Sequence, residues 1–276
     1  MNHSLVEIQD LTHTYPDGTE AVHRVSLRIR NGESVAVVGA NGAGKSTLLL
    51  HLNGSLIPQN GTIRVGDVHI TKATLSDIRR TVGMIFQDPD DQLFMPTVAE
   101  DVAFGPISLG LAPEEVERRV TAALHQVHAT HLRDRPPYKL SGGEKRLAAI
   151  ATVLAMTPDI LVMDEPSSNL DPRARRALIE LLAGFRQTKI IATHDLDLVL
   201  DLCERTVVLR EGRIMADGPT SDIFAADRLL AESHLEKPLR LQACPVCSRR
   251  GPMTAPLPGF GRNSNPDEPE GNRARQ

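Results

Sequence analysis

The sequence is poor in aromatic residues and in cysteine, and it shows no excess of basic charge. None of its 276 residues is tryptophan, and it has only six phenylalanines and two tyrosines. The predicted core is therefore aliphatic, and three cysteines do not make a disulfide framework. With 31 Lys and Arg against 35 Asp and Glu, the formal net charge is −4. This balance argues against a non-specific nucleic-acid binder, because that class of protein carries a basic excess.

Long apolar runs are lacking as well. The run at residues 147–156 is about half of the roughly 18 apolar residues that a membrane span needs, so we do not expect the chain to cross a membrane itself. The first ten residues, MNHSLVEIQD, contain neither a charged n-region nor an apolar h-region, and we therefore expect no secretory signal. Together these absences predict a cytoplasmic protein.

Short apolar runs alternate with helical patterns along the chain, which predicts an α/β fold. We expect buried parallel strands at 34–38, 160–163 and 189–193, helices at 113–127 and 173–185, and half-exposed antiparallel strands at 5–9 and 25–30. A mostly helical stretch, about 88–157, interrupts this pattern and is interpreted as an inserted helical subdomain. Cys203 lies in a helical pattern and is expected in the core.

The composition changes near residue 244. The last 33 residues contain six prolines and four glycines with almost no apolar periodicity. Such a segment buries too little surface to offset the entropy of ordering it. We therefore predict one folded domain at 1–243 and a disordered tail at 244–276.

The motif GANGAGKS at residues 39–46 matches G-x-x-x-x-G-K-[ST], and it stands between a predicted strand and a predicted helix. Its glycines let backbone N–H groups converge on phosphates at a helix N-terminus. Lys45 is expected to reach the β- and γ-phosphates, and the Ser46 hydroxyl to coordinate Mg²⁺. A Gly-rich turn with an exposed lysine is the alternative, which the flanking strand and helix disfavour. The predicted nucleotide-binding residues of this segment are Gly39, Asn41, Gly42, Ala43, Gly44, Lys45, Ser46 and Thr47.

Two acids follow the apolar run ILVM at residues 160–163. A strand that ends in a carboxylate places it at the C-terminal edge of the sheet, where open α/β sheets bind ligands. Asp164 suits the Mg²⁺ shell, and Glu165 suits a general base for the attacking water. Alone, the two acids would more often cap a helix, but the phosphate loop favours the catalytic interpretation.

The motif LSGGE at residues 140–144 leads into a predicted helix at 145–156. Ser141, Gly142 and Gly143 form a second helix N-terminus that suits a phosphate. One ATP does not need two such cradles from one chain. We therefore expect a head-to-tail dimer in which residues 141–143 of each chain close over residues 39–46 of the other.

Taken together, these motifs resemble the nucleotide-binding subunit of ABC transporters in order and spacing over about residues 4–240. Gln87, the SNLD segment at 168–171 and His194 extend the resemblance. It implies a P-loop NTPase (RecA-like) core with an antiparallel β subdomain and an inserted helical subdomain. It also implies hydrolysis of ATP with Mg²⁺, coupled to transport.

The resemblance also implies roles for individual residues. Tyr15, which stands 24 residues before Gly39, would stack on adenine. Gln87 would contact Mg²⁺ and the attacking water and report to the membrane partner. Asp171 would cross the dimer interface, and His194 would hydrogen-bond the γ-phosphate. The residues alone favour an ordinary packed ring for Tyr15 and, for His194, a histidine at a strand end that caps a helix.

One departure from the family pattern concerns the helix after LSGGE. The family usually continues with Lys or Gln, Lys or Gln, and Arg, whereas this chain has Lys145, Arg146 and Leu147. Because a helix turns by about 100° per residue, Arg146 faces a direction different from that of the customary arginine. We expect a changed helix contact and a retained ATPase.

The segment QDPDDQLF at residues 87–94 resembles the energy-coupling-factor class, and residues 212–223 and 232–239 are similar to its cobalt and nickel branch. This resemblance implies integral-membrane scaffold and substrate-binding partners, and attachment to the cytoplasmic face of the cell membrane. Leu93, Phe94 and Met95 are either residues of a groove for the scaffold or subdomain core. The alternatives are a vitamin importer, a soluble ABC-type switch, and a pair with a homologous ATPase in place of a homodimer.

Two features are suggestive of metal binding. His125, His128 and His131 recur every third residue, which we interpret as a solvated helical face rather than a metal site. Cys244 and Cys247 form half of a Cys₄ zinc motif, which we interpret as a reduced pair at the start of the tail.

Overall fold

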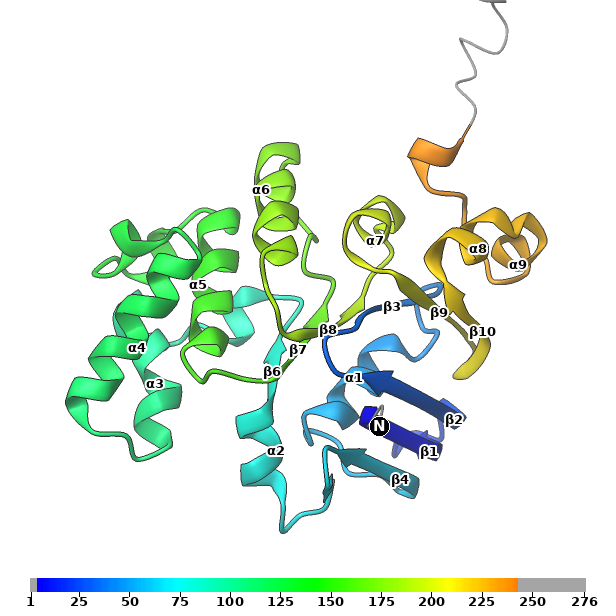
Figure 1. The fold of residues 1–276 in the computed structure, drawn as a ribbon, viewed down its shortest axis with the longest axis horizontal. Helices are drawn as coiled ribbons and strands as arrows, with labels where there is room; N and C mark the ends of the chain where they lie inside the picture. The colour runs from blue at the N-terminus through cyan, green and yellow to red at the C-terminus, as the bar shows by residue number, and fades with distance from the viewer. Residues whose placement is uncertain (1–3, 243–276) are drawn as a thin grey trace, which may run out of the picture. The chain divides into compact units, whose positions relative to one another are not determined.

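The computed structural model describes residues 4–242, and the helices and strands named below belong to a compact unit, Met1–Arg240 (Figure 1). Of a second unit, Leu241–Gln276, only residues 241 and 242 are described. The predicted tail at 244–276, with Cys244 and Cys247, therefore lies outside the described residues.

Two sheets organise the unit. Their strands are β1 (Ser4–Thr14), β2 (Glu20–Arg30), β3 (Ser34–Val38), β4 (Asn60–Val65), β5 (Val68–His69), β6 (Val82–Ile85), β7 (Ile160–Asp164), β8 (Thr188–Ala192), β9 (Arg205–Arg210) and β10 (Arg213–Pro219). One sheet has the order β2-β1-β4-β5 and is antiparallel. The other has the order β10-β9-β3-β8-β7-β6, and it is parallel except for β10 at its edge.

Helices connect these strands. They are α1 (Lys45–Leu52), α2 (Leu75–Thr81), α3 (Val98–Ser108), α4 (Pro113–Gln126), α5 (Gly142–Leu154), α6 (Pro172–Ala183), α7 (Leu196–Leu202), α8 (Thr220–Ala225) and α9 (Asp227–Glu232). Short 3₁₀ helices are η1 (Pro89–Asp91), η2 (Thr130–Leu132), η3 (Pro137–Lys139) and η4 (Leu239–Leu241). In Figure 1, α3, α4 and α5 lie together, apart from the antiparallel sheet.

The parallel sheet is buried on both faces, which explains its continuous apolar strands. Along β3, Val35 and Val37 belong to the core shared with the antiparallel sheet and α1. Ala36 and Val38 belong to a second core, which contains buried residues of helices α3 to α9 and is called the core beneath the helices. Side chains alternate between faces along a strand. A strand of this sheet therefore contributes side chains to both cores. Because the strand is fixed by packing on both faces, the start of the loop that follows its carboxyl end is fixed as well.

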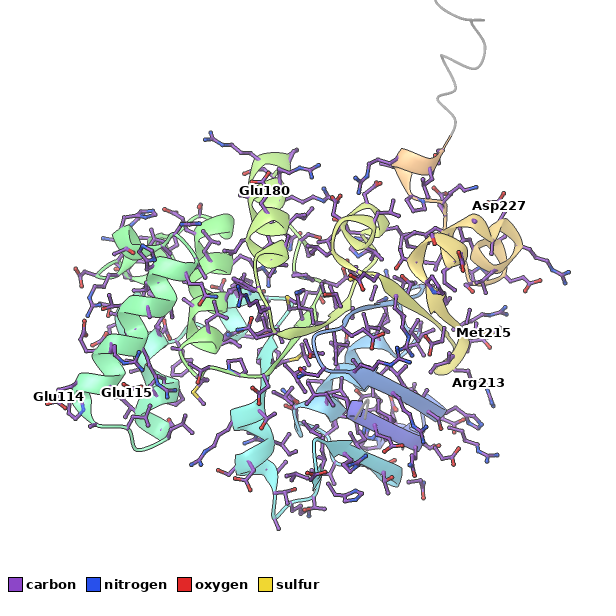
Figure 2. All side chains as sticks on the ribbon, in the orientation of Figure 1. Glu114, Glu115, Glu180, Arg213, Met215 and Asp227 are labelled. Atoms are coloured by element: carbon purple, nitrogen blue, oxygen red, sulfur yellow. The ribbon has the colours of Figure 1, made fainter. Side chains whose placement is uncertain are left out.

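The helix starts follow local sequence chemistry. Pro113 is the first residue of α4, and two acids, Glu114 and Glu115, occupy its first turn (Figure 2). Asp171 caps α6 by accepting hydrogen bonds from the backbone N–H groups of Arg173 and Ala174. Negative charge is favourable at a helix N-terminus. These residues predicted the starts of α4 and α6 to within one position.

The histidines at 125, 128 and 131 are exposed to solvent, as predicted, but the helical face predicted for them was wrong. Helix α4 ends at Gln126, His128 has a positive φ of 57°, and His131 lies in η2. The three histidines therefore do not share a helical face, and no group of three metal-ligating side chains occurs within residues 4–242. The expected core position of Cys203 is confirmed, since the residue is buried, and burial raises the pKa of its thiol to about 12.

The segment that follows β6 divides between core and surface. Leu93 belongs to the core beneath the helices, whereas the neighbouring Phe94 is 62% exposed. Leu93 is therefore not a groove residue, because its side chain is already covered by its own chain. Phe94 packs edge-to-face against Phe104 of α3, with ring centroids 5.0 Å apart, and both rings remain exposed.

Candidate nucleotide site

The loop between β3 and α1 shapes the phosphate end of the site. Gly42 and Gly44 have positive φ values of 78° and 99°, which are accessible to glycine at no steric cost. A Cβ added at Gly44 would lie 2.2 Å from the carbonyl oxygen of Ala21. Gly44 is also the N-cap of α1, where no side chain caps the helix and no acid occupies the first turn. This helix N-terminus therefore suits an anion.

Lys45 folds back over the same loop. Its ammonium donates hydrogen bonds to the carbonyl oxygens of Gly39, at 2.8 Å, and Ala40, at 3.2 Å. The side chain is buried, with 7% exposed. Lys45 is thus held beside the turn whose N–H groups would bind phosphate. When ATP binds, a phosphate oxygen would replace these carbonyl oxygens as the hydrogen-bond acceptor of the Lys45 ammonium.

A pocket of about 410 Å³ collects most of the predicted site residues. Its lining residues are Tyr15, Thr19, Ala21, Asn41, Gly42, Ala43, Gly44, Lys45, Ser46, Thr47, Gln87, Glu165 and His194. Thr19 and Ala21 were not predicted. They lie at the start of β2, which the backbone path of β1 and β2 brings over the phosphate loop, and no local motif marks them.

The aromatic end of the pocket is built around Tyr15, which follows β1. Its hydroxyl shares a 3.1 Å hydrogen bond with the hydroxyl of Thr47 in α1. The ring of His13 packs edge-on against it, with centroids 4.8 Å apart, and His51 lies behind His13 at 4.7 Å. Burial lowers the pKa of both histidines. A half-buried ring backed by neutral imidazoles can stack on a flat base.

Asp164, the last residue of β7, provides a carboxylate that interacts with Ser46 and Lys45 of the phosphate loop. Burial raises the pKa of this carboxyl, although a hydrogen bond from Ser46 acts in the opposite direction. One of its oxygens, Oδ1, is buried and has no hydrogen-bond partner. A hard divalent cation prefers such oxygen ligands. The Asp164 carboxylate and the Ser46 hydroxyl therefore fit Mg²⁺, whose positive charge would favour the ionised form of the acid.

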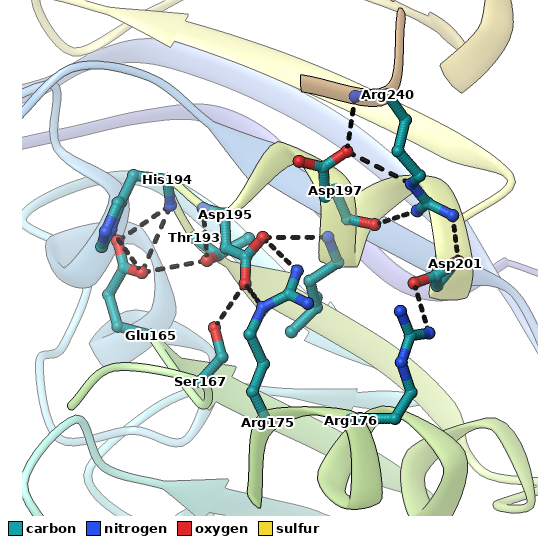
Figure 3. Close-up of polar contacts among 11 residues, drawn as sticks. Glu165, Ser167, Arg175, Arg176, Thr193, His194, Asp195, Asp197, Asp201 and Arg240 are labelled. Carbon is teal, nitrogen blue, oxygen red and sulfur yellow. Dashed lines mark hydrogen bonds and ion pairs between the residues drawn. The ribbon is translucent and has the colours of Figure 1, made fainter. Parts of the chain in front are cut away.

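Glu165 is held in a left-handed backbone conformation, with φ of 45°. Its carboxylate accepts a hydrogen bond from the Thr193 hydroxyl at 2.9 Å and from the His194 backbone N–H at 3.1 Å (Figure 3). The Nδ1 atom of His194 lies 2.8 Å from Glu165 Oε2. Strained conformations of this kind persist when the surrounding structure fixes them, and they gather at functional sites.

The loop that carries His194 is anchored by its neighbour Asp195. This carboxylate accepts a 3.0 Å hydrogen bond from Ser167 and forms an ion pair with Arg175 of α6 (Figure 3). It also caps α7 through the backbone N–H of Leu198. Burial acts to raise the pKa of Asp195, but these hydrogen bonds hold it below its ordinary value. Sequence reasoning missed this anchor, because Arg175 and Asp195 lie on different elements.

Six predicted site residues do not line this pocket: Gly39, Asp164, Ser141, Gly142, Gly143 and Asp171. Gly39 and Asp164 belong to the segments described above, and the other four lie at the starts of two helices. Ser141 is the N-cap of α5, in a capping box with Glu144, and Gly142 and Gly143 form the first turn. Asp171 caps α6. A Cβ on Gly143 would lie 3.3 Å from the Cβ of Ala174 in α6. The start of α5 and the start of α6 are therefore neighbours, and the pocket of the same chain does not include them.

The helix after the LSGGE motif makes an unusual contact. Arg146 is buried, and its guanidinium donates hydrogen bonds to the carbonyl oxygens of Phe86, at 2.7 Å, and Gln87, at 2.6 Å. Leu147 is half-buried and packs against the core beneath the helices. Arg146 therefore faces the segment that follows β6.

A glycine-rich loop at the junction of β3 and α1, with two acids at the end of β7 in the same parallel sheet, defines a P-loop ATPase. The comparisons narrow this class. A family model described as "ABC transporter" matches residues 22–168. The chain belongs to the ABC transporter family, and it is the ATP-binding and ATP-hydrolysing subunit of such a transporter, using Mg²⁺.

Relatives cover most of the chain. A candidate ABC transporter ATP-binding protein of Geobacter sulfurreducens is 66% identical over 249 residues, which are 90% of this chain and 100% of that protein. The energy-coupling factor transporter ATP-binding protein EcfA of Methanothermobacter thermautotrophicus is 45% identical over 239 residues, covering 85% of this chain and 77% of that protein.

Solved structures show the same architecture. CbiO1 of Clostridium perfringens, part of the ABC transporter complex CbiONQ, matches with a TM-score of 0.75 and 36% identity, over 84% of this chain and 94% of that one. The dimeric ATP-binding cassette MJ0796, bound to ADP and phosphate, matches with a TM-score of 0.70 and 27% identity, over 78% of this chain and 98% of that one. The predicted P-loop NTPase fold, with its antiparallel and helical parts, is thereby confirmed. None of the helices within residues 4–242 is long and apolar enough to span a membrane.

Proposed function

We propose that this chain is the ATPase of an energy-coupling-factor importer for cobalt or nickel ions. In this proposal it works as a homodimer on the cytoplasmic face of the cell membrane, bound to integral-membrane scaffold and substrate-binding subunits. The observation that carries the ATPase role is the single pocket that joins Tyr15, the phosphate loop, Gln87, Glu165 and His194. The likeness to EcfA and to CbiO1 supports the energy-coupling-factor type.

Each pocket residue has a task in hydrolysis. The ring of Tyr15 stacks on the adenine, and Lys45 with the loop N–H groups binds the phosphates. When bound to Ser46, Asp164 and Gln87, Mg²⁺ supplies positive charge against the phosphate oxygens.

Glu165 accepts a proton from the attacking water as the water oxygen bonds to the γ-phosphorus and the bond to the ADP oxygen breaks. His194, on the loop that follows β8, hydrogen-bonds the γ-phosphate. The 2.8 Å contact between these two side chains supports a shared task at the γ-phosphate.

The placement of the second cradle supports a dimer. Ser141 and Gly142 are exposed at the start of α5, and they do not line the pocket of their own chain. Asp171 is exposed beside them. In a homodimer these residues close over the phosphate loop of the other chain, and both sites are complete.

An exposed apolar patch supports the membrane partner. It consists of Phe94, Phe104 and Ile107, which are 62%, 49% and 62% exposed. Contiguous apolar side chains on a surface mark interaction sites. The patch begins seven residues after Gln87 in the sequence. A scaffold helix bound there would therefore contact the same segment of the chain that contributes Gln87 to the nucleotide pocket.

Purification of the chain from membranes under mild detergent tests the transporter assignment. The expected result is a complex with integral-membrane subunits that contains two copies of this chain. A fully soluble ATPase without such partners would support the alternative of a soluble ABC-type switch. A complex with one copy of this chain and one homologous ATPase would contradict the homodimer.

Substitution of Glu165 by Gln tests the catalytic assignment. The amide keeps a hydrogen-bond acceptor for Thr193 but cannot take the proton of the water. We expect ATP binding within about twofold of the native protein, a trapped ATP-bound dimer, and turnover reduced by a factor of about 100 or more. Hydrolysis at the native rate would show that Glu165 is not the general base.

The solute assignment depends on the resemblance of residues 212–223 and 232–239 to the cobalt and nickel branch. Uptake of radioactive Co²⁺ and Ni²⁺ by vesicles containing the purified complex tests it. ATP-dependent accumulation of either ion is expected, and E165Q complexes are the matched control. Vesicles that accumulate a vitamin and neither ion would establish the vitamin importer instead.

A further inference from the structure

We propose that Arg146 is a positioning residue for ATP hydrolysis, which acts by holding the backbone of Gln87 against the start of α5. The inference rests on the proposed role of Gln87 at the Mg²⁺ and the attacking water. It assigns a task to the arginine that stands one position before the customary one in the family pattern.

The first observation is the burial of a charged group among backbone oxygens. Arg146 is only 2% exposed, and its two terminal nitrogens donate to the carbonyls of Phe86 and Gln87. Its Nε atom is buried without a partner. Within residues 4–242 the direct partners of this guanidinium are the two carbonyl oxygens, while the charge of Asp88 also acts favourably on it. A buried charge whose direct partners are main-chain oxygens is costly to retain, which argues for a task beyond packing.

The second observation concerns the two segments that the hydrogen bond between Arg146 and Gln87 joins. Gln87 lines the nucleotide pocket, and its own carbonyl is the acceptor of the 2.6 Å bond. Arg146 lies in the second turn of α5, whose first turn contains Gly142 and Gly143. The guanidinium therefore joins the residue in this chain's pocket to the helix that presents the cradle for the second nucleotide.

Other contacts between α5 and this segment lie further from the pocket. The Gln92 amide donates to the carbonyl of Ala149 at 2.8 Å and to the Thr152 hydroxyl at 2.7 Å. Lys145 forms an ion pair with Asp90 at 2.6 Å. These contacts keep the segment near α5 when Arg146 is replaced, whereas the guanidinium bonds directly to the carbonyls of residues 86 and 87. Lys145 thus offers a matched control on the neighbouring position of the same helix.

The test compares R146M, R146K and the control K145M in the full chain, with ATP affinity, kcat and thermal stability measured for each. We expect R146M to lower kcat by a factor of about 10 to 100, because small displacements of a reacting group cost this much, while its ATP Kd changes by no more than about twofold. R146K can donate to one carbonyl and should recover part of kcat. K145M removes a surface ion pair of small energy, so its kcat should stay within about twofold of native.

A double-mutant cycle with Gln87→Ala separates positioning from a general structural effect. If Arg146 acts through Gln87, R146M lowers kcat in the native chain but changes it by less than about twofold when Gln87 is absent. A kcat of R146M within twofold of native, or a full additional loss in the Q87A chain, would overturn the inference. A Q87A chain that hydrolyses ATP at the native rate would overturn the proposed role of Gln87 and this inference with it, while leaving the ATPase assignment intact.

Discussion

Helices α1 and α5 both begin in glycine-rich sequence, yet they differ in whether side chains of the protein hydrogen-bond to the N–H groups of the first turn. At α1 the cap is Gly44, with no side-chain hydrogen bond and no acid in the first turn. At α5 the cap is Ser141, whose hydroxyl accepts from the backbone N–H of Glu144, while the Glu144 carboxylate accepts from the backbone N–H of Ser141. The first end is open to an anion, and the second is closed by its own chain.

The difference shows that a glycine-rich helix start does not by itself make a phosphate site. What decides is whether the terminal N–H groups already have partners. The chain therefore has one cradle that is ready to bind ATP and one whose hydrogen bonds must be shared when a nucleotide from another chain arrives. Four substitutions test this comparison, from the largest expected effect to the smallest.

Gly44→Ala should abolish anion binding at the N-terminus of α1. The new Cβ would lie 2.2 Å from the Ala21 carbonyl, and the residue has a φ of 99°, so the loop must change shape. We expect ATP affinity to fall by a factor of about 100 or more. Isothermal titration calorimetry with ATP measures it. Gly142→Ala is the matched control at α5, where the nearest atom lies 4.0 Å away, and native affinity in G44A would contradict the comparison.

Lys45→Ala should weaken the open end without deforming it. The substitution removes a charged donor that lies over the loop, and hydrogen bonds to charged groups contribute about 1.5 to 3 kcal/mol, or about 10- to 100-fold in affinity. The same titration applies. Unchanged nucleotide binding would count against the whole site.

Ser141→Ala should destabilise the closed end. Loss of an N-cap costs about 1 kcal/mol, which corresponds to a Tm lower by about 2 to 4 °C for a domain of this size. Differential scanning calorimetry measures it, with the ATP affinity of the single chain as the control, which should stay at the native value. A native Tm would mean that the capping box does not stabilise α5.

Glu144→Gln should give the smallest effect, and one that depends on pH. Hydrogen bonds from the Ser141 backbone N–H and hydroxyl, with the charge of Arg135, lower the pKa of Glu144 from its ordinary 4.5. A carboxyl with a lowered pKa in the folded state stabilises the fold above its ordinary pKa, and this contribution is lost as the pH falls through the lowered value. The Tm of E144Q should therefore be below native at pH 7, and the gap should narrow below pH 4.5.

The matched control for this pH dependence is Glu114→Gln. Glu114 is an exposed acid in the first turn of α4, a helix without a side-chain cap. E114Q removes a first-turn charge without breaking a capping box, so narrowing of the E144Q gap beyond any seen in E114Q measures the capping box. A gap in E144Q that is constant between pH 7 and pH 4 would exclude the charged capping box as its cause.

The parts of the fold that sequence predicted are those that local pattern dictates. Strands β3 and β7 are continuous apolar runs, and the residues that follow them reach the carboxyl edge of the sheet whatever the rest of the chain does. For this reason the motif at 39–46, Asp164 and Glu165 predicted most of one pocket. The antiparallel pair β1 and β2 followed from simple alternation.

The remaining features depend on contacts between distant residues. The ion pair of Arg175 with Asp195 joins residues 20 positions apart, and Ala21 meets Gly44 only because β2 crosses the loop. Leu93 and Phe94 are adjacent and equally apolar, yet one is buried and the other exposed, because η1 and the turn after it follow no regular period. The histidines at 125, 128 and 131 were misjudged because α4 ends at Gln126, where the sequence shows neither glycine nor proline.

The lack of tryptophan gives the nucleotide pocket a built-in optical signal. Tyrosine is then the main source of ultraviolet emission, and the chain has only two tyrosines. Tyr15 lines the pocket and hydrogen-bonds Thr47, whereas Tyr138 is 77% exposed. A chain with Tyr138→Phe would emit from Tyr15 alone, so that binding of a nucleotide could be followed in real time without a label attached to the protein or to the ATP.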